Sequence, residues 1–377
     1  MNGRTQAYVG RIEDAAADQI PPEYRLETYN YALPPKLIAQ EPLPCRDDSR
    51  LMVLRRGTGR IDHHRFVDLP LLLEPSDLIV INETRVVPAL LIGQKKTGGR
   101  VELLVLDPAE EIARKDRNAG ALRECMVRSS KPLRPGVEIE ISGGALVAAE
   151  ETIAPGRVII RFPVLERDLL GFLYSHGHSP LPPYIKPEGR KEDRDRARYQ
   201  TVYATTPGSV AAPTAGLHFT GRSLDTLGIR GIEIVPVLLH VGPGTFTPVR
   251  EEDIRRHRLE HEFFSIPEES AAHISRALAD KRRVIAIGTT TVRALESAAD
   301  DSGAVAAISG RSSLFIQPGY RFKVVSGLLT NFHLPRSTLL MLVCTFGGTE
   351  AVLTAYREAI SNRYRFYSYG DACLIVD

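Results

Sequence analysis

The chain has 377 residues, of which 43% are hydrophobic and 25% are charged, and its formal net charge at pH 7 is +2. This composition is typical of a soluble globular protein, and the length exceeds what one hydrophobic core usually supports, so we expect two domains. The small net charge neither requires nor excludes a nucleic-acid partner, because a nearly neutral chain can still carry a local basic face.

The cysteines and the N-terminal residues indicate the compartment. The four cysteines are too far apart in the sequence to form a CxxC pair or a zinc knuckle. Residues 1–24 contain charged side chains and lack the apolar stretch of a secretory signal, so we expect a mobile N-terminal extension. The longest apolar run, Leu339 to Phe346, is far shorter than the roughly 20 residues that a membrane span needs. We therefore expect a reduced, cytoplasmic protein.

The first ordered part of the chain alternates between helix and strand patterns. Helices are predicted near residues 35–39 and 69–73, and strands are predicted at residues 51–54 and 78–81. Such alternation is typical of the opening of an α/β unit.

The next part, residues 88–164, contains short β-rich runs without a convincing long helix. Turn signals such as Pro135-Gly136 and Pro155-Gly156 separate the runs. The expected strands are residues 89–92, 101–106, 124–127, 137–141 and 157–162. Five or six strands at this spacing predict a small, closed or partly closed β-barrel, inserted into the main domain.

After the barrel, helix and strand patterns alternate again. The expected helices are residues 165–174, 196–204, 267–279 and 350–360, and the expected strands are residues 232–239, 284–287 and 372–376. The predicted fold is a layered α/β main domain, residues 25–87 and 165–377, with an inserted small antiparallel β-barrel domain. The polar run 186–198 is either a solvated loop or a flexible basic arm that meets phosphates.

The segment GSVAAPTAGLHFT, residues 208–220, has the composition of a binding loop. It contains two glycines, a proline, three hydroxyl groups and His218, but no Asp, Glu, Lys or Arg. Its apolar residues follow no amphipathic period. Small residues let a ligand approach the backbone, and a histidine exchanges protons near neutral pH. A buried turn with a hydrogen-bonded histidine explains the same composition.

Three other motifs could carry chemistry. Gly288 and the threonines after it follow a predicted strand and precede a helix, so free N–H groups there could receive an anion, although hydroxyls also cap helices without a ligand. No GxGxxG or Walker-type loop is present in the sequence. In residues 331–338, capping explains Ser337 but not His333 or Arg336. Residues 364–371 interleave aromatic side chains with arginine, as a base-stacking surface or an ordinary strand would.

His257 to His261 match the HxxEH pattern of inverted zinc proteases. On a helix this spacing would place both histidines on one face, beside a glutamate. The motif lacks a third ligand, and Pro248 and Pro267 limit the helix to a few turns.

Ten segments in order support one resemblance over residues 31–376. They are LIAQEPL (37–43), SRLMVL (49–54), TRV and the following proline (84–88), PPYI (182–185), RYQTVYA (198–204), GSVAAPTAGLHFT (208–220), LHVGPGTF (239–246), GTTTVRALES (288–297), TNFHLPRSTLLMLV (330–343) and YRFYSYGDACLI (364–375). In these segments the chain resembles the S-adenosylmethionine:tRNA ribosyltransferase-isomerase family of the queuosine pathway.

The chain departs from that family's pattern at two places. Glu83 stands where the family usually has Asp in NDTRV, and Glu260 stands where it usually has a histidine in HxMHxE. No catalytic histidine can therefore be carried over to Glu260. Because His261 falls at a variable position, the departure also weakens the zinc interpretation.

The resemblance implies a defined reaction and defined partners. The ribosyl moiety of S-adenosylmethionine, the co-substrate, is transferred and isomerised onto 7-aminomethyl-7-deazaguanine at the wobble position of a tRNA with a GUN anticodon. The products are epoxyqueuosine-tRNA, adenine and methionine. We expect a monomer that uses no metal and contacts no membrane.

This chemistry needs a base for a carbon-bound proton beside the sulfonium, a donor for the adenine that leaves, and groups that hold methionine. The residues that we expect for proton handling are His218, His240, His333 and Asp371. Those expected for co-substrate binding are Arg85, Thr214, Gly216, Gly288, Thr289, Thr290, Arg293 and Glu296. Those expected to contact tRNA are Arg190, Lys191, Arg336, Arg363 and Arg365, with the wobble base flipped into a pocket.

Two alternatives remain open. One is a noncatalytic tRNA-binding protein on the same fold, which would release no adenine from S-adenosylmethionine. The other is a zinc hydrolase built on His257 and His261, which stoichiometric zinc would reveal.

Overall fold

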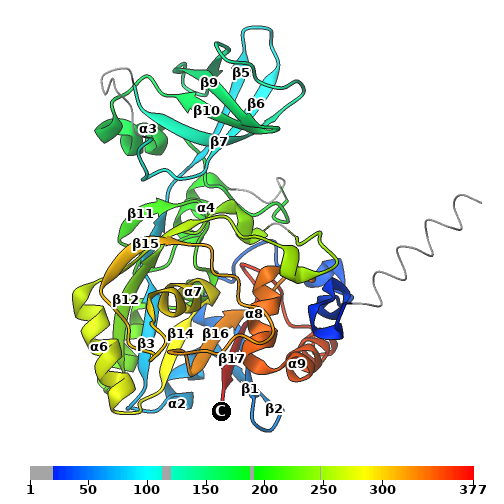
Figure 1. Ribbon diagram of the computed structural model, residues 1–377, viewed down its shortest axis with the longest axis vertical. Coiled ribbons are helices and arrows are strands. Elements are labelled where there is room, and N and C mark those ends of the chain that lie inside the picture. Colours follow the sequence, from blue (N-terminus) through cyan, green and yellow to red (C-terminus); the bar gives the residue numbers. More distant parts are fainter. Residues whose placement is uncertain (1–19, 113–119, 187–190, 247) are drawn as a thin grey trace, which may run out of the picture.

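The computed structural model describes residues 20–112, 120–186, 191–246 and 248–377. A nine-stranded sheet forms the centre of the larger domain (Figure 1). Its strands, in spatial order, are β15 (Ile308–Ser312), β13 (Glu262–Ile266), β12 (Glu233–Leu239), β3 (Leu78–Asn82), β14 (Val284–Ile287), β16 (Gly327–Asn331), β17 (Ala372–Val376), β1 (Arg50–Arg55) and β2 (Arg60–Arg65).

The middle of this sheet is parallel and fully buried. β12, β3, β14 and β16 run in the same direction, so their carboxyl ends meet at one edge. β17 lies between β16, with which it is antiparallel, and β1, with which it is parallel. Every residue of β3, β14, β16 and β17 is buried, which explains why these strands are continuous apolar runs.

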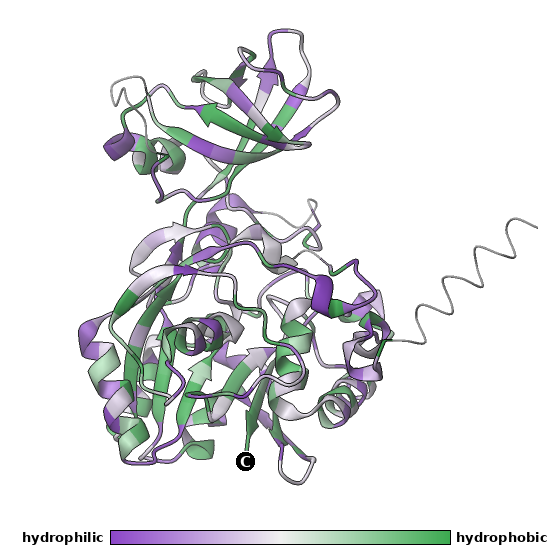
Figure 2. Ribbon diagram, in the orientation of Figure 1, coloured by the Kyte–Doolittle hydropathy of each residue, from purple (hydrophilic) through white to green (hydrophobic). Residues whose placement is uncertain are grey.

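Helices cover both faces of the sheet. One face packs against α6 (Glu268–Ala279), α7 (Thr289–Ala298), α8 (Thr338–Gly347) and α9 (Thr349–Ser361). The other face packs against α2 (Leu69–Leu72) and α5 (Gly221–Ile229). Alternate residues of one strand serve the two faces, since Leu78 and Val80 belong to the first core and Ile79 and Ile81 to the second. Figure 2 shows the central strands as hydrophobic and α6 as amphipathic.

A closed, six-stranded antiparallel barrel stands apart from this sheet, at the top of Figure 1. Around the barrel the strands are β10 (Arg157–Arg161), β7 (Leu122–Ser129), β6 (Arg100–Val105), β5 (Leu90–Lys95), β8 (Glu138–Ile141) and β9 (Leu146–Ala154). The barrel has its own hydrophobic core, to which α3 (Leu169–His176) contributes. The expected fold class, a layered α/β domain with an antiparallel barrel, is confirmed. The division into residues 1–24, 25–87 with 165–377, and 88–164 stays a prediction.

Three local predictions need correction. The polar run 186–198 is not a loop throughout, because α4 (Glu192–Arg198) forms there, with acidic residues in its first turn and arginines in its last. The helix expected over 196–204 ends with α4 at Arg198. The helix expected over 35–39 is a 3-10 helix, η3 (Pro35–Leu37).

The expected N-terminal extension lies largely outside the described residues. Its last part, Pro22–Tyr24, forms a short 3-10 helix, η1. Among the described residues, no single helix has the length and apolarity to cross a membrane. α8 and α9 together meet those two criteria, but the pair is bent by 114°.

Candidate active site

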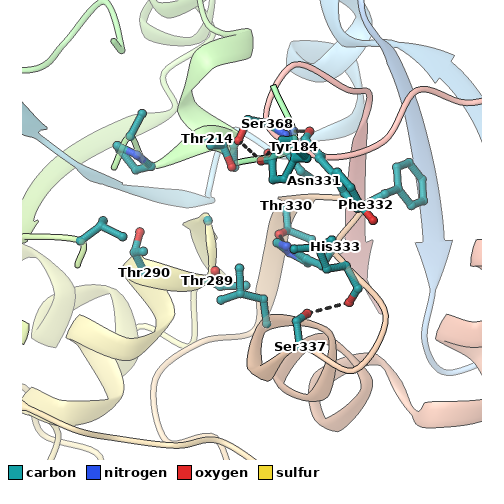
Figure 3. A pocket seen from close by; sticks show the side chains of 18 residues that line it. Tyr184, Thr214, Thr289, Thr290, Thr330, Asn331, Phe332, His333, Ser337 and Ser368 are labelled. Atoms are coloured by element: carbon teal, nitrogen blue, oxygen red, sulfur yellow. Dashed lines mark hydrogen bonds between the residues drawn. The ribbon is translucent and has the colours of Figure 1, made fainter. Parts of the chain in front are cut away.

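A cleft lies at the carboxyl ends of the central strands, and 18 residues line it (Figure 3). The term cleft is used below for this site, whose polar lining is Tyr184, Thr214, Thr289, Thr290, Thr330, Asn331, His333, Ser337, Tyr367 and Ser368. It is partly open to solvent, and it combines an apolar wall with a few convergent polar groups, as small-molecule sites do. None of its lining residues is Asp, Glu, Lys or Arg, so the cleft is polar but carries no formal charge.

The topology explains why these residues meet. β14 and β16 are parallel neighbours, so the turn after Ile287 and the turn after Asn331 leave the same edge of the sheet. Ligands of open α/β sheets bind outside this edge. Gly288, the N-cap of α7, has a φ of 91°, which favours glycine in the tight turn between strand and helix.

Two helices begin at the cleft. Thr289 and Thr290 open α7, and Ser337 caps α8 by accepting a hydrogen bond from the backbone N–H of Leu340 at 3.2 Å. Figure 3 shows the two helix ends on different sides of the site. Because free N–H groups and the helix dipole favour negative charge, the uncharged cleft is suited to an anionic group such as a carboxylate.

His218 is held rigidly at the end of the 3-10 helix η8 (Thr214–His218). Its Nδ1 lies 2.7 Å from Ser49 Oγ, its Nε2 lies 3.2 Å from Asn331 Nδ2, and its ring stacks on Phe66. Burial, together with the nearby Arg365 and Arg46 charges, lowers the pKa of His218 to about 3. His218 is therefore neutral near pH 7. It lies beside a smaller pocket and is connected to the cleft through Asn331.

Asn331 connects His218 with the cleft. Its Nδ2 also donates to the carbonyl oxygen of Tyr367 at 3.2 Å, which fixes the amide orientation. His218 Nε2 must then accept from this amide, so the ring proton is on Nδ1, directed at Ser49. Asn331 Oδ1 is buried and has no hydrogen-bond partner among the described residues, which makes it an acceptor suited to a ligand donor.

His333 itself lines the cleft. Its Nε2 lies 2.7 Å from Thr330 Oγ1, and its backbone N–H donates to the Tyr356 hydroxyl at 3.0 Å. Burial lowers the pKa of His333 to about 3, so this ring is also neutral near pH 7. Across the site, Tyr367 has a φ of 72°, a strained conformation for a bulky side chain, of the kind that clusters at functional sites.

The other two residues expected to handle protons lie elsewhere. His240 does not line the cleft; its Nδ1 is 2.8 Å from Thr84 Oγ1, and burial lowers its pKa to about 4. Asp371 accepts hydrogen bonds from the backbone N–H groups of Arg50 and Arg365 and from the Arg50 guanidinium. This geometry gives Asp371 a positioning role.

Of the eight residues expected for co-substrate binding, four line the cleft: Thr214, Gly288, Thr289 and Thr290. Gly216 does not line the cleft, and a Cβ at this position would come within 2.0 Å of the Tyr203 hydroxyl. Arg85 donates to the Ala204 carbonyl oxygen away from the cleft. Glu296 accepts from the backbone N–H groups of residues 323–325 and so holds that loop.

Arg293 lines a different site, which we call the interdomain cavity. It lies between the barrel and the main domain, and its charged lining residues are Asp107, Glu124, Arg157, Glu260, Glu262, Arg293 and Arg311. Arg293 Nη1 donates to buried Glu262, whose other oxygen accepts from the Gly242 N–H at 2.8 Å. Leu339 lines both the cleft and the interdomain cavity, so the two are neighbours.

The expected tRNA contacts are dispersed. Arg190 lies outside the described residues, Lys191 is the exposed N-cap of α4, and Arg363 is exposed after α9. Arg336 pairs with Glu27. Arg365 donates to the backbone oxygen of Glu41.

The proposed zinc motif does not form. Residues 257–261 have no helical turn before β13 begins, and His257 Nδ1 lies 3.1 Å from Glu251 Oε2 instead. Glu260 pairs with Arg157 of the barrel. Within the described ranges, no group of three or more His, Cys, Asp or Glu side chains is arranged to hold a metal.

Sequence reasoning missed Asn331, Ser49 and Thr330, which organise the two histidines. Asn331 offers one signal in the sequence, since it is a polar residue at the end of a buried strand. Ser49 has none, because it contacts His218 from a distant part of the chain.

Comparisons with known proteins identify the family of the chain. A family model described as queuosine biosynthesis protein matches residues 26–375. An S-adenosylmethionine:tRNA ribosyltransferase-isomerase of Anaeromyxobacter sp. (strain Fw109-5) is 50% identical over 93% of this chain and 99% of its own. One from Gloeobacter violaceus is 49% identical over 94% and 96%. The crystal structure of S-adenosylmethionine tRNA ribosyltransferase from Thermotoga maritima matches with a TM-score of 0.52 and 34% identity, covering 93% of this chain and 100% of that one.

Proposed function

Because the chain belongs to the queuosine biosynthesis protein family and is an S-adenosylmethionine:tRNA ribosyltransferase-isomerase, we propose that its cleft holds S-adenosylmethionine against a tRNA wobble base. The acceptor base is 7-aminomethyl-7-deazaguanine in a GUN anticodon. The ribosyl moiety is transferred and isomerised, adenine and methionine leave, and the product is epoxyqueuosine-tRNA. The protein acts as a cytoplasmic monomer.

The observation that carries this assignment is a neutral histidine, His333, in an uncharged cleft between two helix N-termini. A sulfonium acidifies the adjacent carbon, and a neutral imidazole can accept the proton that is removed. A carboxylate in the same place would form an ion pair with the sulfonium and weaken its effect.

The other residues divide the remaining tasks. The methionine carboxylate lies at the N-terminus of α7, near Gly288, Thr289 and Thr290. Asn331 Oδ1 accepts a hydrogen bond from the aminomethyl group or another ligand donor, while Nδ2 keeps His218 in place. His218 takes part in proton transfer next to Asn331. His240 and Asp371 lie outside the cleft lining and act as positioning residues.

The interdomain cavity and the outer surface serve binding. Arg293 and Glu262 are a charged pair in the neighbouring cavity, and we retain Arg293 as a residue that supports co-substrate binding from the other side of Leu339. For tRNA, we retain Arg190, Lys191, Arg336, Arg363 and Arg365 as contacts that meet the RNA backbone.

Adenine release from S-adenosylmethionine in the presence of the modified tRNA tests the proposal. We expect His333→Ala to lower kcat by about 10²- to 10⁴-fold, because general base catalysis contributes that much. We expect His218→Ala to act in the same direction. The matched control is His64→Ala, which changes a half-buried histidine of the edge strand β2, outside the cleft and the interdomain cavity.

Two outcomes would contradict the proposal. Wild-type turnover by His333→Ala would remove the proton-transfer role of His333. No adenine release by the wild-type protein, with tRNA binding retained, would favour a noncatalytic tRNA-binding protein.

A further inference from the structure

We propose that a pocket beside the cleft binds a phosphodiester group of the RNA substrate. We call it the arginine pocket; it is a shallow, partly open hollow, and Arg46, Ser49, Arg198, His218, Tyr369 and Gly370 are among its lining residues. It lies between α4, the 3-10 helix η4 (Arg46–Asp48) and the loop before β17. The inference rests on the proposed function, because it assumes that the substrate is a tRNA.

Two arginines of this pocket lack a carboxylate partner. Arg46 donates to the carbonyl oxygens of Leu217 at 3.0 Å and Ala197 at 3.1 Å. Arg198 donates to the carbonyl oxygens of Leu43 at 2.7 Å and Pro44 at 3.0 Å. Among the described residues neither guanidinium forms an ion pair, whereas buried or half-buried arginines such as Arg123, Arg283 and Arg293 do. Carbonyl oxygens orient the two groups but leave their charge uncompensated.

A third arginine adds to the positive charge. Arg365 Nη2 donates to the backbone oxygen of Glu41. Both Arg365 and Arg46 lie close enough to His218 to disfavour its protonated form. Two guanidinium groups that line one pocket without a paired carboxylate, with a third nearby, are electrostatically unfavourable until an anion binds.

Nearby carboxylates have other partners. Asp371 pairs with Arg50, and Glu41 pairs with Arg194. Asp195 accepts from the Lys191 N–H and the Arg194 guanidinium, and Asp47 accepts from the Thr220 hydroxyl. Each of these carboxylates is thus committed to a group other than Arg46 or Arg198.

Hydrogen-bond donors without partners support the same conclusion. Tyr369 is 5% exposed and lines the pocket, and its hydroxyl has no hydrogen-bond partner in the described parts of the chain. Arg198 Nε, in the same lining, is also buried and unpartnered among the described residues, and so is Arg365 Nη1, which lies outside the lining. Native proteins satisfy nearly all buried polar groups, so several orphan donors around one pocket indicate an acceptor supplied by a ligand. An oxyanion supplies several acceptor oxygens and compensates the charge.

The charge and position of the pocket favour an RNA phosphate over S-adenosylmethionine. A sulfonium would be repelled by three guanidinium groups, whereas a phosphodiester is attracted, and arginine matches its geometry well. Ser368 lines both the arginine pocket and the cleft, and the His218–Asn331 contact joins them. A phosphate held here would therefore place a neighbouring nucleotide at the cleft, where its base can be reached.

Tyr369→Phe tests the pocket without removing any hydrogen bond of the described residues. We expect the variant to keep the thermal stability of the wild type, because the hydroxyl has no partner in the described ranges, and to raise the Kd of the substrate tRNA about three- to tenfold. Arg198→Gln should also flatten the salt dependence of tRNA binding, by about 0.7 to 0.9 in the slope of log K against log salt. Arg276→Gln, an exposed arginine of α6, is the matched control and should change the slope less.

The Kd of S-adenosylmethionine, measured on the same proteins, separates the sources of the anion. An unchanged co-substrate Kd with weakened tRNA binding supports the inference. A weakened co-substrate Kd with unchanged tRNA binding would assign the pocket to the methionine carboxylate and overturn it, and unchanged values for both ligands would also overturn it.

Failure of the proposed function would be seen separately. If the wild-type protein did not bind the tRNA, the RNA assignment would fail with it. Inorganic phosphate would then test the oxyanion site alone. A higher melting temperature of the wild type, but not of Arg198→Gln, in the presence of phosphate would support the site. An equal response of the two proteins would contradict it.

Discussion

The cleft and the interdomain cavity are neighbouring sites, but the first has an uncharged lining and the second has a charged one. The cleft has no charged side chain in its lining, and its histidine is kept neutral by burial. The interdomain cavity has seven charged residues in its lining, several of them paired across the two domains. The difference indicates that the residues proposed for the chemistry lie in one site, and the ion pairs that join the two domains lie in the other. In the proposed function, an uncharged site would leave the charge of a cationic co-substrate unquenched, while ion pairs join the barrel to the main domain.

The charged region contains one buried pair, whose loss should have the largest effect on stability. Glu262→Gln leaves the Arg293 guanidinium buried without a charge partner, and removal of one member of such a pair costs about 3–5 kcal/mol. We expect that loss in the free energy of unfolding, measured with urea. Glu260→Gln, which changes a half-exposed pair, should cost no more than about 1 kcal/mol. Equal losses for the two variants would remove the distinction between buried and exposed pairs in this cavity.

The neutral histidines should make stability depend on pH. Burial depresses the pKa values of His218 and His333 to about 3 and of His240 to about 4. The unfolded chain therefore binds more protons than the folded one below about pH 6.5, and stability falls as the pH decreases. From pH 7 to pH 5 each of these histidines should account for about 2 kcal/mol.

A histidine variant checks the origin of this loss. His240→Gln should lose less unfolding free energy between pH 7 and pH 5 than the wild type, as measured by chemical denaturation at each pH. The exposed His261→Gln should behave as the wild type does. Parallel pH curves for all three proteins would show that other groups cause the acid sensitivity.

The exposed ion pairs of the interdomain cavity should have the smallest effect. Arg311 of β15 pairs with Asp107 at 3.0 Å and with Glu110, and all three side chains are partly exposed. We expect Arg311→Gln to change the free energy of unfolding by no more than about 1 kcal/mol. The barrel should nevertheless become more mobile, which small-angle scattering at low and high salt can detect. A large loss of stability with an unchanged scattering profile would assign Arg311 to the fold of the main domain.

Most of the fold was predictable because the buried strands are continuous apolar runs. The central strands around residues 78–81, 232–239, 284–287 and 372–376 were all identified, since both of their faces are covered. β9 was missed because three consecutive exposed residues, Glu151 to Ile153, obscure the alternation of a strand. α4 was missed because its stability comes from charge placement and tertiary contacts, which hydrophobic periodicity does not report.

The site was predictable where one short segment supplies it. Thr214, Gly288, Thr289, Thr290 and His333 lie in motifs that the sequence displays, and the structure brings them together. Other contacts depend on packing between distant segments, which a single sequence does not reveal. The placement of Arg293 in another cavity and the carbonyl partners of Arg46 and Arg198 are of this kind.

The position of β17 in the sheet has a consequence for how the protein is made. Leu51 of β1 pairs with Ala372 of β17, and Asn331 of β16 pairs with the same residue. During translation, β1 and β16 cannot complete their pairing in the sheet until β17, which lies between them, has been synthesised. The residue that orients His218 is thus secured only when β17 has emerged, so a nascent chain or a product truncated before Ala372 should have no working catalytic centre.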